Sequence, residues 1–178
     1  PYLDATALHI AAERGHAEAV RLFLDRGADI EAKNEHGCTA LHKAAESGHV
    51  EVVRLLLDRG ADIEAKEKNN KTALYLAAER GYVEVARLFL GRGADIEAEN
   101  EYGRTVLMHA AMDGSAKAVK VLLDIGVDVS AKDAKGRTLL CYAAMSGKAK
   151  IAELIASKGV GPNDRDAEGR TALMHAAM

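Results

Sequence analysis

Apolar positions along the chain follow helical spacing and restart at regular intervals. Leu8 and the pair Ala11-Ala12 form a narrow apolar stripe after Thr6. A second apolar stripe runs from about His16 to Leu24, after Gly15. Threonine is a favoured N-cap residue, and glycine reaches the left-handed conformation that ends helices. The pattern therefore predicts two short helices that are separated at Gly15.

This two-helix pattern recurs every 33 residues. A Thr-x-Leu-x-x-Ala-Ala motif begins at Thr6, Thr39, Thr72, Thr105, Thr138 and Thr171. One helix pair is too small to bury its apolar face alone, whereas stacked copies bury a continuous core. We therefore expect an all-α solenoid that forms a single domain over residues 1–178. Its repeats span about 1–33, 34–66, 67–99, 100–132 and 133–165, with a partial repeat at 166–178.

The segments between the helix pairs carry turn signals of their own. Glycine recurs at one place in these segments, where we expect a positive φ, and Asn70 holds that place in the third repeat. The glycines are Gly37, Gly103, Gly136 and Gly169. A β-branched residue precedes each turn, and we expect it to be a buried anchor. These anchors are Ile30, Ile63, Ile96 and Val129.

The second copy, from Gly37 through the Thr39 motif to Leu57, resembles an ankyrin repeat. The resemblance extends over essentially the whole chain. It implies a β-hairpin-like loop followed by an antiparallel helix pair in each repeat. It also implies protein recognition through the hairpin tips and the concave face of the first helices. The motif histidine, kept at His9 and His42, is by the same resemblance a structural hydrogen-bonding residue.

Composition and charge narrow the possible functions. Aromatic residues make up only 4% and tryptophan is absent, so the core must consist of Ala, Leu, Val and Ile. The net charge is −3, with no dense basic stripe of the kind that nucleic acid requires. The sequence contains no run of about 18 apolar residues, the length that would predict a membrane span. Cys38 and Cys141 make no disulfide framework, and with no leader sequence they favour an intracellular, cytoplasmic protein.

Catalytic and cofactor motifs are missing from the pattern. Repeat position accounts for most of the seven histidines, and no histidine or cysteine pair has zinc-ligand spacing. No glycine-rich phosphate loop is present. Cys38 is close in sequence to His36 and His42, but a nucleophile pair also needs an orienting group and an oxyanion hole, and we expect Cys38 to lie beside an exposed, mobile hairpin tip. We therefore predict a protein that is not an enzyme and has no cofactor or metal.

The residues that vary between repeats are the candidates for partner binding. On the first helices of repeats four and five, apolar, aromatic and polar side chains replace the charged ones of the earlier repeats. Exposed tyrosine, arginine and methionine are frequent interface residues. The alternative is that these side chains pack between neighbouring repeats. The candidates are His109, Met112, Asp113, Tyr142 and Met145 on the helix face, and Tyr102, Arg104, Lys135 and Arg137 at the hairpin tips.

These observations favour a non-catalytic scaffold that binds another protein, and neither nucleic acid nor a membrane. Two further hypotheses stay open at this point. The end repeats have no dedicated polar cap, so exposed apolar faces predict end-to-end self-association. The chain is alternatively a regulatory or targeting segment of a larger enzyme.

Overall fold

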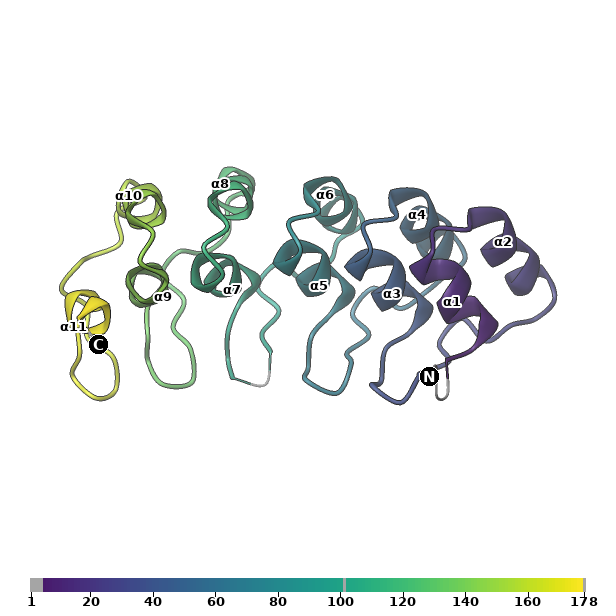
Figure 1. Ribbon diagram of the computed structural model, residues 1–178, viewed down its shortest axis with the longest axis horizontal. Coiled ribbons are helices and arrows are strands. Elements are labelled where there is room, and N and C mark those ends of the chain that lie inside the picture. The colour runs from purple at the N-terminus through teal and green to yellow at the C-terminus, as the bar shows by residue number, and fades with distance from the viewer. Residues whose placement is uncertain (1–4, 101, 178) are drawn as a thin grey trace. The chain divides into compact units, whose positions relative to one another are not determined.

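The computed structural model describes residues 5–100 and 102–177. Within these ranges the chain forms eleven helices and no strand, which confirms the predicted all-α class (Figure 1). Two isolated antiparallel bridges, Lys66 with Thr72 and Lys132 with Thr138, close hairpin-like loops. None of the described helices is long and apolar enough to cross a membrane.

The helices belong to two compact units, of which the first ends at Asp95 and the second begins at Ile96. The first unit contains α1 (Ala7–Glu13), α2 (Ala17–Asp25), α3 (Ala40–Glu46), α4 (Val50–Asp58), α5 (Ala73–Glu79) and α6 (Val83–Gly91). The second contains α7 (Val106–Met112), α8 (Ala116–Ile125), α9 (Leu139–Ser146), α10 (Ala149–Ala156) and α11 (Ala172–Ala176).

Within each unit the helices pack as stacked pairs. In the first unit α1 packs on α3 and α3 on α5, while α2, α4 and α6 form a second row (Figure 1). In the second unit α7, α9 and α11 pack in the same manner, and α8 packs on α10. The fully buried alanines Ala12 and Ala45 let adjacent helices approach closely. The core is therefore built mainly from small and aliphatic side chains, as the composition predicts.

The motif threonine and histidine together form the helix start. The Thr6 hydroxyl accepts a hydrogen bond from the His9 backbone N–H (3.4 Å), and His9 Nδ1 accepts one from the Thr6 N–H (3.2 Å). His9 Nε2 lies 2.8 Å from the carbonyl oxygen of Cys38 in the next repeat. His42 repeats this arrangement with Thr39. Both histidines thus have the structural hydrogen-bonding role that the family resemblance implies.

The loop glycines adopt the backbone conformation that the sequence predicts. Gly103 has φ 68° and Asn70 has φ 60°, so the asparagine takes the left-handed position in its repeat. The predicted anchor residues are less buried than the sequence suggested. Ile30 and Ile63 are only half-buried and pack against the edge of the first unit's core. Ile96 and Val129 are also half-buried, which corrects the expectation of full burial.

Candidate partner-binding surface

A buried polar side chain at the base of each hairpin in the second unit organises the loop. Asn100 Oδ1 accepts hydrogen bonds from the backbone N–H groups of Tyr102 (2.9 Å) and Arg104 (3.1 Å). Asp133 Oδ1 does the same for Lys135 (2.9 Å) and Arg137 (2.8 Å). Such side-chain turns satisfy backbone donors that the loop leaves without partners. The four hairpin-tip candidates therefore start from fixed backbone positions.

Neighbouring hairpins of the second unit are also joined through their backbones. The Ala134 N–H donates to the Tyr102 carbonyl oxygen at 3.2 Å, and the Ala167 N–H donates to the Lys135 carbonyl oxygen at 3.0 Å. A Cβ at Gly103 would lie 2.8 Å from the Ala134 nitrogen, so only glycine allows this approach. The tips consequently form a row of connected loops.

A first-helix side chain ties each loop to the helix that follows it. The Tyr142 hydroxyl donates to Asp133 Oδ2 at 2.5 Å, and His175 Nε2 lies 2.8 Å from Asp166 Oδ2. In repeat four, His109 Nε2 lies 3.3 Å from Asn100 Nδ2. Sequence reasoning missed this connection. The sequence does carry a signal for it: in each of these repeats, a residue with a polar group follows the loop residue by nine positions.

Tyr142 and His109 were expected on the exposed helix face, and the structure corrects that placement. Tyr142 is 0% exposed and His109 is 7% exposed. The alternative that the sequence left open, packing inside the repeat stack, describes these two residues. Their hydrogen bonds to the loop bases make burial of the polar atoms tolerable.

Charge is concentrated around the Tyr142 hydroxyl. Burial, together with the hydrogen bond to Asp133, raises the pKa of Tyr142 to about 12. Burial also acts to raise the pKa of Asp133, but hydrogen bonds from Tyr142 and Arg137 outweigh it and hold that pKa below its usual value. The Asp133 carboxylate is therefore ionised at neutral pH, and its 2.6 Å ion pair with Arg137 Nη2 persists.

Arg104 lies against aromatic rings. Its guanidinium carbon is 5.0 Å from the centre of the Tyr102 ring and 5.5 Å from the centre of the Tyr142 ring. Its Nη1 is 3.7 Å from Met112 Sδ. Cation–π contacts of this kind orient a guanidinium without neutralising its charge.

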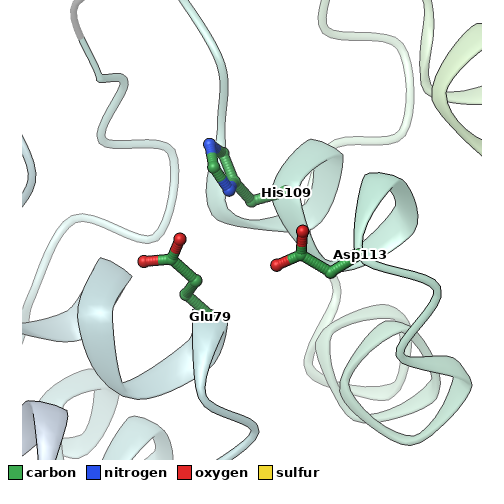
Figure 2. Close-up of side chains that lie close together, drawn as sticks. All are labelled: Glu79, His109 and Asp113. Atoms are coloured by element: carbon green, nitrogen blue, oxygen red, sulfur yellow. The ribbon is translucent and has the colours of Figure 1, made fainter.

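The remaining candidates differ in their exposure. Tyr102 is 54% exposed and Met145 is 46% exposed. Asp113 and Lys135 are exposed, while Arg104, Met112 and Arg137 are partly exposed. Figure 2 shows His109 on α7 and Asp113 at its C-terminal end. Seven of the nine candidates are thus accessible at least in part.

The corresponding surface of the first unit contains ion pairs. Arg80 Nη2 lies 2.7 Å from Glu46 Oε1, and Lys71 Nζ lies 3.1 Å from Glu79 Oε2. Glu79, also drawn in Figure 2, is the last residue of α5. Each of these charges is paired inside the unit. In the second unit, Met112 and Met145 stand at the repeat position that Glu46 and Glu79 hold in the first.

The titratable groups of each unit bear on metal binding and on nucleophilic catalysis. Taken by itself, neither unit brings three histidine, cysteine or acidic ligand atoms together in its described part. Cys38 is buried, and this burial raises the pKa of its thiol, which opposes formation of the nucleophilic thiolate.

Comparison with known proteins supplies the family. The sequence model described as ankyrin repeats, in three copies, matches residues 3–67, 64–133 and 125–178. A search of curated proteins found no significant match. The matched segments cover nearly all of the sequence and contain the helix pairs and hairpin loops described above. The chain therefore belongs to the ankyrin-repeat family.

Proposed function

We propose that this protein is a non-catalytic scaffold that binds a partner protein through the hairpin tips and first helices of its second unit. Ankyrin repeats are generally protein–protein interaction modules. The observation that carries the proposal is the exposure of Tyr102 (54%) and Met145 (46%) in a unit whose loop backbones are held by side-chain hydrogen bonds. Large apolar side chains on a rigid support are typical of interaction surfaces.

Rigidity supports this proposal through the entropy of binding. Ordering a flexible loop on association costs free energy, which a loop already held by Asn100 or Asp133 does not lose again. The side chains that remain adjustable are Met112 and Met145, and methionine adapts its shape to different partners. The surface therefore combines fixed backbone positions with adaptable contact atoms.

The first test is selection of binders from a random twelve-residue peptide display library. We expect the double variant Tyr102→Ser, Met145→Glu to bind the selected peptides at least about tenfold more weakly than the wild type, because both changes remove exposed apolar contacts. The dissociation constant is measured by fluorescence anisotropy, and a thermal melt checks the fold.

Leu22→Ser is the matched control, since Leu22 is a 49% exposed apolar residue of the first unit. This control should leave the affinity unchanged. Equal affinities for the wild type and the double variant, or an equal loss in Leu22→Ser, would contradict the proposed surface.

A second candidate function is self-association, which the exposure of Leu173 favours. Leu173 is 79% exposed, whereas its equivalents Leu107 and Leu140 are 1% and 6% exposed. Beside it lies an apolar groove of about 540 Å³, lined by residues of α9, α10 and α11. A second copy of this chain is the occupant we propose, because Ala7 is exposed while its equivalent Ala40 is buried by the preceding repeat. The two surfaces then cover each other as successive repeats do.

A further inference from the structure

The residue directly before the cap threonine is a cation in repeats three to six. In three of these repeats an internal carboxylate neutralises it. Lys71 Nζ lies 3.1 Å from Glu79 Oε2, Arg137 Nη2 lies 2.6 Å from Asp133 Oδ2, and Arg170 Nε lies 3.0 Å from Asp166 Oδ2. Arg104 is the cation at this position in repeat four.

In the other three repeats, the carboxylate that pairs with this cation comes from one of two repeat positions. Both positions hold neutral residues in the repeat of Arg104. Met112 stands where repeat three has Glu79, and Asn100 stands where repeats five and six have Asp133 and Asp166. No carboxylate among the described residues pairs with Arg104. Its Nε is buried and has no hydrogen-bond partner there.

The contacts that Arg104 does make orient it without neutralising it. The Tyr102 and Tyr142 rings lie 5.0 and 5.5 Å from its guanidinium carbon, and Met112 Sδ is 3.7 Å from Nη1. A planar guanidinium held in this manner keeps donors that match the two oxygens of a carboxylate. A charge that is partly removed from water is unfavourable when, as within the described part of the chain, it has no counterion, so an anion from outside would stabilise it.

We propose that Arg104 binds a carboxylate of an acidic segment in the partner protein, with the exposed Tyr102 ring as the adjoining apolar contact. This inference rests on the proposed function and names the chemistry of its partner. One unneutralised guanidinium matches the single charge of Asp or Glu. Arg137, the next cation along, is already neutralised by Asp133. A doubly charged phosphate group would therefore find no second unpaired cation at the equivalent position of the next repeat.

The test uses three probes: acetyl-tetraglutamate amide, acetyl-tetraglutamine amide and inorganic phosphate. The readout is the NMR signal of the Arg104 Nε–H in the wild-type protein, assigned by its absence in Arg104→Lys. Tetraglutamate should shift this signal and saturate it, while tetraglutamine should leave it unchanged. No shift with tetraglutamate would overturn the proposal, as would tighter binding of phosphate than of tetraglutamate.

Three variants test the electrostatic argument. Arg104→Gln removes the guanidinium, and Met112→Glu restores the carboxylate that Glu79 provides to Lys71 in repeat three. Both should weaken tetraglutamate binding roughly tenfold or more, since hydrogen bonds to charged groups are of that strength. Lys120→Gln, the same change of charge at an exposed lysine of α8, should change it less than about twofold. An equal loss in Lys120→Gln would show non-specific attraction and overturn the assignment.

The outcome is separable from that of the proposed function. Peptides selected by display that depend on Tyr102 and Met145 but bind Arg104→Gln as well as the wild type would support the interaction surface and overturn the acidic partner. Selected peptides rich in Asp and Glu that lose affinity for Arg104→Gln would support both.

Discussion

Histidines at one repeat position act as internal caps, and their burial has a consequence for pH dependence. His42 Nδ1 accepts the Thr39 N–H at 3.1 Å, and its Nε2 lies 3.3 Å from the Lys71 carbonyl oxygen. Burial lowers the pKa of His42 to about 4, and hydrogen bonds to backbone carbonyls only partly oppose this. A neutral imidazole is therefore part of the folded first unit.

We expect acid to destabilise the protein through His42. Its folded pKa is below the unfolded value of 6.5, so the unfolded chain binds more protons between these values. The contribution is complete above pH 6.5 and is lost as the pH falls through 4, for a total loss of about 3 kcal/mol. Urea unfolding at pH 7 and pH 5 should detect about 2 kcal/mol of this loss.

His42→Met places at this position the residue that repeat four has at Met108. This variant should lose some stability at pH 7, because the cap bonds are gone, but should lose less than the wild type between pH 7 and pH 5. His36→Gln, which removes an exposed histidine, is the control. An undiminished pH 7 to pH 5 difference in His42→Met would rule out His42 as the source.

At the scale of the element, each hairpin of the second unit is attached to the helix that follows it. Asp133 accepts four hydrogen bonds, from the backbone of Lys135, the backbone and side chain of Arg137 and the hydroxyl of Tyr142. The first helix is thus joined to the loop at both the cap threonine and the tyrosine. Because Tyr142 is also fully buried, we expect it to support the proposed surface instead of contacting a partner.

Tyr142→Phe should lower the free energy of unfolding by about 1.5–3 kcal/mol, the usual contribution of a hydrogen bond to a charged group. Tyr142→Ser should cost about 3–5 kcal/mol, because a large buried ring is lost as well. Chemical unfolding measures both effects. Tyr82→Phe is the control, since Tyr82 is 39% exposed, and its cost should be below about 0.5 kcal/mol. A cost as small in Tyr142→Phe would contradict the role of the hydroxyl.

At the scale of the whole molecule, the exposed apolar surface is unevenly distributed. Leu173 and Met174 of α11 are 79% and 48% exposed, next to the apolar groove of α9, α10 and α11. A net charge of only −3 gives weak repulsion between copies. These two features together favour association at high concentration.

We therefore expect the mass from sedimentation velocity to rise with protein concentration. Leu173→Glu should suppress this rise, because it places a charge in the apolar contact. Leu22→Glu, at an exposed leucine of α2, should leave the rise unchanged. A mass that stays monomeric across a wide concentration range would eliminate self-association and leave partner binding as the surviving function.

The repeat pattern determined much of this protein without any structure. The helix pairs, the capping threonines and the positive φ at Asn70 and the loop glycines follow from residue types at a fixed 33-residue period. Each is a local preference of the backbone, and repetition makes it visible in the sequence. The structural hydrogen-bonding role of His9 and His42 followed from the family resemblance. The structure shows it as a helix cap within the repeat and a contact with a carbonyl oxygen of the next repeat.

Tertiary structure alone decided which variable side chains are accessible. Tyr102 and Tyr142 are the same residue type in adjacent repeats, yet one is 54% exposed and the other is buried over Asp133. Likewise, Arg104 and Arg137 hold the same repeat position, but among the described residues a carboxylate pairs only with Arg137, from Asp133 at the base of its own loop. Burial and ion pairing depend on contacts between loop, helix and neighbouring repeat. Local sequence therefore determined the repeat fold, whereas the assembled repeats determined which charges and rings remain for a partner.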